Sequence, residues 1–177
     1  MRSSPTLILL LMTSAPTSSS VIRRVLCLHG SGGTAASFLE RLAPLRSALG
    51  DEWELGALDA PGGSGRWWTY PAGERSFTAA SYEGAEASIS AVERELSTGG
   101  YVGVLGFSQG AMLAALVAAR CSLGESEVTL RFAVLCGGAT PKPYDALLTR
   151  SRTAPRASAL LPTLHCLSAV DDMNPPE

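Results

Sequence analysis

The segment GFSQG at residues 106–110 constrains the fold of this chain more than any other feature, because of what flanks it. An apolar run, YVGVLGF at 101–107, leads into Ser108, and a small-residue segment, QGAMLAALVAA at 109–119, follows it. A G-x-S-x-G segment between a strand and a helix is typical of a nucleophile elbow, a strained turn that exposes a serine hydroxyl. An ordinary strand-to-helix turn with a capping serine is the alternative interpretation.

Apolar runs that alternate with longer amphipathic segments predict an α/β fold. The apolar runs predict strands at 24–28, 53–61, 101–107, 128–138 and 162–172. Apolar residues at helical spacing predict helices at 34–49, 79–98 and 109–120. The segments 62–77 and 139–160 have the composition of loops, the second with room for a short helix. Strands separated by helices in this way favour a doubly wound, mostly parallel sheet.

Length and composition fit one globular domain. The chain has 177 residues, of which 46% are hydrophobic and 17% charged, and we assign the domain to residues 21–177. Residues 1–20 combine Arg2, a short apolar run and a Ser/Thr-rich stretch, so a secretory signal, an organelle transit peptide and a disordered extension fit equally. A net charge of −2 without a basic run argues against nucleic acid as a partner. No apolar stretch approaches the roughly 20 residues of a membrane span.

The cysteines predict neither a disulfide framework nor a metal site. The four cysteines form no CxxC pair, and three of them lie in apolar runs, so we expect buried free thiols. Free thiols favour a reducing compartment, and we therefore expect a cytoplasmic protein, with organelle targeting or secretion left open by residues 1–20. His165 and Cys166 are neighbours on a predicted strand and point to opposite faces, which argues against a zinc site.

Acyl transfer at Ser108 would need two backbone N–H groups that stabilise the developing oxyanion. Gln109, directly after the serine, is the first candidate. Ser31, in the glycine-rich loop after the first strand, is the second. The first and third strands of a doubly wound sheet can be neighbours at the switch point, where ligands bind. We therefore expect both donors to face one pocket.

Two loops are candidates for the wall of this pocket. His29 and Gly30 belong to the loop after the first strand, and Trp67 and Trp68 lie in the irregular segment 62–77. Adjacent large aromatic side chains in a loop predict an apolar lid over the pocket or a satellite hydrophobic cluster.

The acid and the base of a serine hydrolase are expected after the nucleophile in the chain. Asp171 and Asp172 follow the last predicted strand, and either carboxylate could orient an imidazole. The two histidines, His29 and His165, both precede them. His165 lies mid-strand, about 10 Å below the strand end at 3.3 Å per residue, which predicts a core or surface position. His29 is expected to brace its loop, with the role of substitute base as the alternative.

The segments RVLCLHG, RWWTYP and GFSQGAMLAALVAA, together with the strand that ends in D..NP, resemble the FSH-type serine hydrolases, a branch of the α/β-hydrolases. The resemblance covers about residues 23–177 in order. It implies the α/β-hydrolase fold and an esterase or thioesterase that acts on acyl esters without metal or cofactor. It also implies Ser108 as nucleophile and Asp171 as acid, because Pro175 keeps the register of a G-x-x-D-x-x-x-P pattern.

Two departures from the family pattern bear on activity. Ser168 stands where the family usually has glycine. The family's histidine belongs to a GGH-like segment past the acid, followed by a terminal helix, whereas this sequence ends at Glu177. The resemblance thus implies either a C-terminally truncated serine hydrolase or a degenerate one. A serine hydroxyl without a base is barely nucleophilic.

Two other functions fit parts of the sequence. A hydrolase fold without catalysis could bind acyl ligands or partners through the pocket at Ser108. A dinucleotide-binding oxidoreductase is the second alternative, because Gly30, Gly32 and Ala35 satisfy G-x-G-x-x-A after a strand, and Asp59 ends the next strand.

Overall fold

The computed structural model describes residues 21–154, 161–171 and 173. Its centre is one parallel sheet of five strands in the order β2-β1-β3-β4-β5. The strands are β1 (Arg23–Leu28), β2 (Trp53–Leu58), β3 (Tyr101–Phe107), β4 (Phe132–Cys136) and β5 (Thr163–Cys166). The predicted α/β fold with a parallel sheet is confirmed, and β1 and β3 are neighbours as expected. The leader assigned to residues 1–20 lies outside the described residues.

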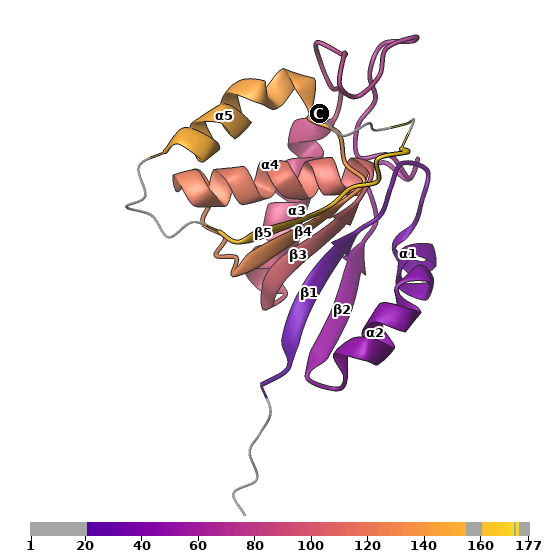
Figure 1. Ribbon diagram of the computed structural model, residues 1–177, viewed down its shortest axis with the longest axis vertical. Helices are drawn as coiled ribbons and strands as arrows, with labels where there is room; N and C mark the ends of the chain where they lie inside the picture. The colour runs from indigo at the N-terminus through magenta and orange to yellow at the C-terminus, as the bar shows by residue number, and fades with distance from the viewer. Residues whose placement is uncertain (1–20, 155–160, 172, 174–177) are drawn as a thin grey trace, which may run out of the picture.

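Helices cover both faces of the sheet (Figure 1). One face carries α1 (Ala35–Arg41) and α2 (Ala43–Leu49), which pack on β1 and β2. The other carries α3 (Ala85–Thr98), α4 (Gln109–Leu123) and α5 (Asp145–Thr153), the last preceded by a 3-10 turn, η1 (Lys142–Tyr144). In this arrangement α4, the helix that follows Ser108, lies against β3 and β4, between α3 and α5.

An apolar core lies on each face of the sheet. The larger core joins the sheet to α3 and α4, and includes Leu26, Leu28, Ile89, Val104, Leu113, Leu116 and Leu135. The smaller core joins it to α1 and includes Val25, Cys27, Phe38, Leu55 and Leu105. Most of α4 is buried, and its small side chains let the helix lie close to the strands. This packing fixes the N-terminal end of α4, where Ser108 lies.

Two predicted helices have different bounds in the structure. The segment 34–49 forms two helices instead of one, because Pro44, at the start of α2, has no N–H to continue the first helix. The helix predicted at 79–98 begins only at Ala85, since Gly84 has a φ of 88° and an antiparallel bridge joins Thr69 to Glu83. The strand predicted at 128–138 is confined to β4 and the one at 162–172 to β5.

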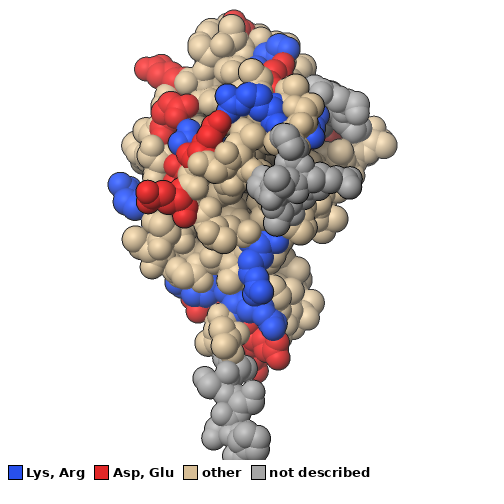
Figure 2. All heavy atoms as spheres, turned by 90° about the vertical axis from the view of Figure 1, so that its left-hand side faces the viewer, with Lys and Arg blue, Asp and Glu red and all other residues tan. Residues whose placement is uncertain are grey.

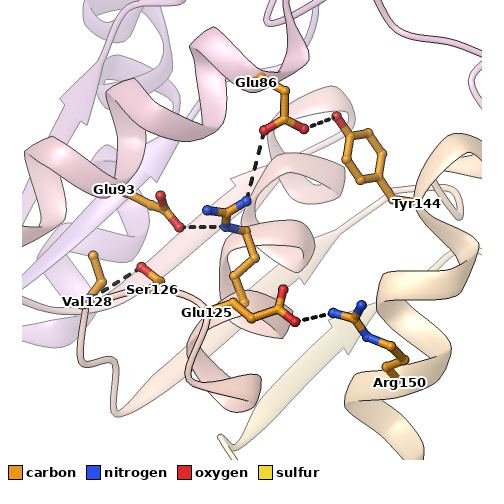
Figure 3. Close-up of polar contacts among 8 residues, drawn as sticks. Glu86, Glu93, Glu125, Ser126, Val128, Tyr144 and Arg150 are labelled. Carbon is orange, nitrogen blue, oxygen red and sulfur yellow. Dashed lines mark hydrogen bonds and ion pairs between the residues drawn. The ribbon is translucent and has the colours of Figure 1, made fainter.

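A polar network joins the helices on the α4 side of the sheet (Figure 3). Arg120 of α4 pairs with Glu93 of α3 at 2.9 Å and with Glu86 at 4.0 Å. Tyr144 of η1 donates a hydrogen bond to the Glu86 carboxylate at 2.8 Å. Burial, and then the Glu86 acceptor, raise the pKa of the Tyr144 hydroxyl. The network therefore ties η1, and with it the start of α5, to α3 and α4.

Charges of both signs are interspersed on the face of the molecule that Figure 2 shows. Two exposed ion pairs involve residues of α5: Lys142 pairs with Asp145 at 2.7 Å, and Arg150 pairs with Glu125. Such exposed pairs contribute little stability. None of the helices in the described part of the chain has the length and apolar character to cross a membrane. That the protein does not bind nucleic acid stays a prediction.

Candidate active site

Ser108 occupies a strained turn between β3 and α4. Its φ is 53° and its ψ −119°, and it is the only non-glycine residue with a positive φ among the described residues. Strain of this kind costs on the order of 1–3 kcal/mol and persists only where the surrounding structure enforces it. Here the Ser108 N–H donates to the Cys136 carbonyl of β4 at 2.9 Å, and the next residue begins α4. The predicted strand-to-helix turn is confirmed.

The glycines on either side of Ser108 are required by close backbone contacts. A Cβ atom on Gly110 would lie 2.2 Å from the Leu28 carbonyl oxygen and 2.6 Å from that of His29. One on Gly106 would lie 2.2 Å from the Gly110 carbonyl oxygen. The first turn of α4 thus lies directly against the ends of β1 and β3, which leaves no room for any side chain at these two positions.

One of the two predicted oxyanion donors lies at this turn, and the other lies in the loop after β1. Gln109 is the first residue of α4, so its N–H has no acceptor within the helix. Across the described residues, neither this N–H nor that of Ser31 makes a hydrogen bond. The loop that carries Ser31 lies next to the serine, because a Cβ on Gly30 would be 3.3 Å from Ser108 Cβ. One unbonded amide therefore lies in the turn of Ser108 and the other in the adjacent loop, and their use as an oxyanion hole stays a prediction.

His29 is a bracing residue in the structure. Its side chain is buried, with Nδ1 2.8 Å from the Gly30 carbonyl oxygen, while the Ala60 N–H donates to Nε2 at 3.3 Å. These two bonds assign the ring proton to Nδ1. Since both nitrogens are engaged, His29 could accept a proton from Ser108 only by losing a bond. The geometry supports the predicted bracing of the loop rather than the substitute base.

Trp67 and Trp68 lie in the main core rather than on an exposed wall. The Trp67 ring stacks on His29 with centroids 4.9 Å apart, and its Nε1–H donates to the His29 carbonyl at 2.8 Å. Trp68 stacks on Tyr82 at 4.8 Å. Both tryptophans are at most 2% exposed. The two rings thus belong to the main core and not to a satellite cluster. The roles of His29, Gly30, Trp67 and Trp68 in a substrate pocket stay predictions.

The Gln109 side chain was not anticipated as a structural residue. Although it is polar, it is 6% exposed, and it lies between Ser108 and the tryptophan segment. Its Oε1 accepts from the Trp67 N–H and its Nε2 donates to the Trp68 carbonyl, both at 3.0 Å. We define the Gln109 clamp as these two bonds. The clamp holds the segment 67–68 to the first residue of α4, and thereby to the turn at Ser108.

Replacing Gln109 by glutamate should destabilise the fold at neutral pH. A carboxylate still accepts from the Trp67 N–H, but it cannot donate to the Trp68 carbonyl and carries an uncompensated buried charge. We expect a loss of about 2–4 kcal/mol of unfolding free energy, measured by thermal unfolding as a fall in Tm of roughly 5–12 °C. Lowering the pH protonates the carboxyl and should restore part of the difference.

The matched control is Glu40→Gln, which changes an exposed side chain of the same pair of types. Its Tm should stay within about 2 °C of the parent. An equal Tm for Gln109→Glu and the parent at neutral pH would show that the clamp does not hold the tryptophan segment.

Asp171 follows β5 and lies near the same end of the sheet. A Cβ on Gly137, the residue after β4, would be 3.7 Å from Asp171 Oδ2 and 3.7 Å from the ring of Phe107. The other carboxylate oxygen accepts from the Met173 N–H at 3.0 Å. This brings the candidate acid to the strand ends that flank Ser108. Asp172, the other candidate acid, lies outside the described residues.

His165 lies away from the turn. It is exposed on β5, with Nε2 3.2 Å from Thr163 Oγ1. Its side chain lines a cavity of about 610 Å³ between α4, α5 and the last two strands, whose wall also includes Ala111, Ala115, Leu135 and Leu148. Ser108 is not among the lining residues, although Ala111 lies one turn away. Of the two positions expected for His165, in the core or at the surface, the structure shows the surface one.

The dinucleotide-binding alternative loses its main residues in the structure. Asp59, the candidate ribose ligand, instead accepts from the Ala35 N–H at 2.6 Å. Thr34 accepts from the Ser37 N–H at 3.1 Å, which completes a capping box. The N-terminus of α1 is therefore capped by the protein's own side chains, at the place where a pyrophosphate would bind.

The chain is similar in sequence to known proteins. The profile of the family described as "Serine hydrolase (FSH1)" matches residues 62–177. A probable esterase of Aspergillus terreus is 32% identical over 83% of this chain and 70% of its own length. Esterase OVCA2 of Danio rerio is 32% identical over 90% of this chain and 82% of its own.

Two solved structures share the fold. Esterase PE8 superposes with a TM-score of 0.63 at 22% identity, over 86% of this chain and 71% of that one. Zea mays acyl-protein thioesterase 2 superposes with a TM-score of 0.65 at 24% identity, over 86% and 74%. The five-stranded sheet with its flanking helices is thus similar to that of α/β-hydrolase esterases and thioesterases.

Proposed function

Because the chain belongs to the FSH1 serine hydrolase family, we propose that it cleaves acyl esters or thioesters with Ser108 as the nucleophile. The strained backbone of Ser108 at the N-terminus of α4 is the observation that carries this proposal. A non-glycine residue in that conformation exposes its hydroxyl and places it where the helix end favours negative charge. The substrate is a small acyl ester or thioester.

In the proposed reaction Ser108 Oγ attacks the acyl carbonyl carbon while a general base takes up the hydroxyl proton. The carbonyl oxygen becomes negatively charged, and the N–H groups of Gln109 and Ser31 donate to it. Collapse of this intermediate expels the alcohol or thiol, which takes that proton from the base, and leaves an acyl ester on Ser108. Water then attacks the acyl-enzyme, releases the carboxylic acid and returns the proton to Ser108.

Asp171 is the proposed acid, which orients an imidazole and stabilises its charged form. The base in this proposal is a histidine that these 177 residues do not contain. His29 has both ring nitrogens in hydrogen bonds, and His165 lies on the cavity wall of β5. The 177-residue chain should therefore bind acyl substrates but turn them over slowly, with the loss in kcat.

Fluorophosphonate labelling tests the nucleophile. The folded chain should be labelled slowly, on Ser108 alone as located by mass spectrometry, and the Ser108→Ala variant should not be labelled. Oxyanion stabilisation and binding without a complete triad still give on the order of 10³–10⁴-fold catalysis over water, so a small Ser108-dependent esterase rate is expected. Labelling that persists in Ser108→Ala would contradict the proposal. Rapid ester turnover would contradict the inference that Ser108 lacks a base. The variant His29→Ala would then test whether His29 is that base.

A non-catalytic acyl-binding protein is the second candidate function. The observation that favours it is the engaged state of His29, which leaves Ser108 without a base among the described residues. Binding of a non-hydrolysable acyl analogue together with no labelling of Ser108 would support this candidate over the hydrolase.

A further inference from the structure

Two cysteines lie side by side at the strand ends behind Ser108. Cys136 is the last residue of β4 and Cys166 the last of β5, and the two are partners in the parallel ladder. Neighbouring strands are about 4.8 Å apart, which falls within the Cα separation of 4.4–6.8 Å that disulfides require. Partners in a ladder also point to the same face, so both thiols lie on one side of the sheet.

The two thiols interact and differ in exposure. Cys136 is half-buried and Cys166 is exposed. Burial, and then the neighbouring Cys166 thiol, raise the pKa of Cys136 to about 11. The remaining cysteines are not ladder partners of Cys166, because Cys27 lies on β1 and Cys121 on α4. Cys166 is thus the thiol that an oxidant reaches first.

We propose that Cys136 and Cys166 are a redox-active pair, which a peroxide converts into a disulfide between β4 and β5. The Cys166 thiolate attacks a peroxide oxygen, so that an S–O bond forms, the O–O bond breaks and an alcohol or water leaves. The Cys136 sulfur then attacks Cys166 sulfur; the S–S bond forms, the S–O bond breaks, and the Cys136 proton leaves with the hydroxide as water. Two thiols lose two electrons, and the peroxide gains them.

The location gives the bond a structural consequence. The carbonyl of Cys136 accepts from the Ser108 N–H, and the carbonyl of Cys166 accepts from the Gly137 N–H, both at 2.9 Å. β5 is a four-residue strand at the edge of the sheet, paired only with β4 among the described strands. The turn that bears Asp171 begins two residues after Cys166. A disulfide would therefore fix this short edge strand, and with it the start of the Asp171 turn, to β4. The Cys136 carbonyl of β4 is the acceptor for the Ser108 N–H.

The test is a hydrogen peroxide titration of the folded 177-residue chain, followed by N-ethylmaleimide trapping, digestion and mass spectrometry. We expect one intramolecular disulfide that joins Cys136 to Cys166, lost on adding dithiothreitol. Thermal unfolding should shift up by about 5–15 °C on oxidation, and amide exchange at Gly137 should slow. None of these readouts depends on hydrolysis, so this proposal stands or fails independently of the proposed function.

Three variants separate the outcomes. Cys121→Ser is the matched control and should form the disulfide like the parent. Cys136→Ser should leave oxidised Cys166 without an intramolecular partner, and Cys166→Ser should abolish both the disulfide and the Tm shift. Main products in which Cys166 is over-oxidised, or is bridged to a second copy of the chain at low protein concentration, would overturn the proposal. So would an unchanged Tm after complete disulfide formation.

Discussion

Imidazole added to the folded 177-residue chain is expected to raise its Ser108-dependent rate of ester hydrolysis by roughly 10- to 100-fold. General base catalysis contributes on the order of 10²–10⁴-fold in enzymes, and a diffusible base recovers only part of it because its position is not fixed. Ser108 is half-buried and therefore reachable, and Asp171, the proposed acid, lies at a neighbouring strand end. The measurement is the initial rate with a p-nitrophenyl ester against imidazole concentration.

Ser108→Ala supplies the control, because imidazole also cleaves activated esters in solution. Subtracting the rate of that variant isolates the contribution of the serine. Asp171→Asn should reduce the imidazole-dependent increment without changing the solution reaction. If imidazole raises the rates of the parent and of Ser108→Ala by the same amount, Ser108 does not act as a nucleophile even when a base is supplied.

Replacing Gly110 by alanine should destabilise the protein by about 2–4 kcal/mol, although alanine is the better helix former. Helix propensity favours alanine by about 1 kcal/mol. Against this, the new Cβ would lie 2.2 Å from the Leu28 carbonyl oxygen, and backbone on both sides of the contact cannot rotate away. Moving α4 off β1 to relieve it opens the core and displaces Ser108. Thermal unfolding should show a Tm lower by roughly 5–15 °C, with slower fluorophosphonate labelling.

Gly124→Ala, at the other end of α4, is the matched control. Gly124 has a φ of 70° and open space around its Cβ position, so alanine there costs only the strain of the left-handed conformation, about 1 kcal/mol. Equal Tm values for the two variants would show that α4 can move away from β1 without loss, which contradicts the close contact at Gly110.

The sequence allowed the sheet and the Ser108 turn to be predicted because both depend on local patterns. A buried apolar run, a glycine-flanked serine and a small-residue helix are contiguous in the chain. The contacts that hold the site are not local. The side chain of Gln109 hydrogen-bonds to Trp67 and Trp68, which lie 42 and 41 positions earlier in the chain. No periodicity encodes such partners, and a polar residue beside a nucleophile gives no sign that it will be buried. The break between α1 and α2, by contrast, could be predicted from the sequence, because Pro44 interrupts the predicted helix at 34–49.

The register of the last two strands was also beyond prediction. Cys136 and Cys166 each lie in an apolar run, which predicts burial for both. Their pairing depends on how far β5 slides along β4, and a shift by one residue would place Cys166 on the opposite face. Cys166 is exposed on the edge strand β5, and a strand's own sequence does not specify its place in the sheet.

The clamp and the stacked His29–Trp67 pair limit how this scaffold could be re-engineered. The β1 loop contacts the tryptophan segment through His29, and that segment contacts α4 through Gln109. Grafting a foreign β1 loop to alter substrate choice would remove one member of this set and leave the others with unmatched buried polar groups. A successful graft would have to transplant His29, Trp67 and Gln109 together, as one module drawn from three separate stretches of chain.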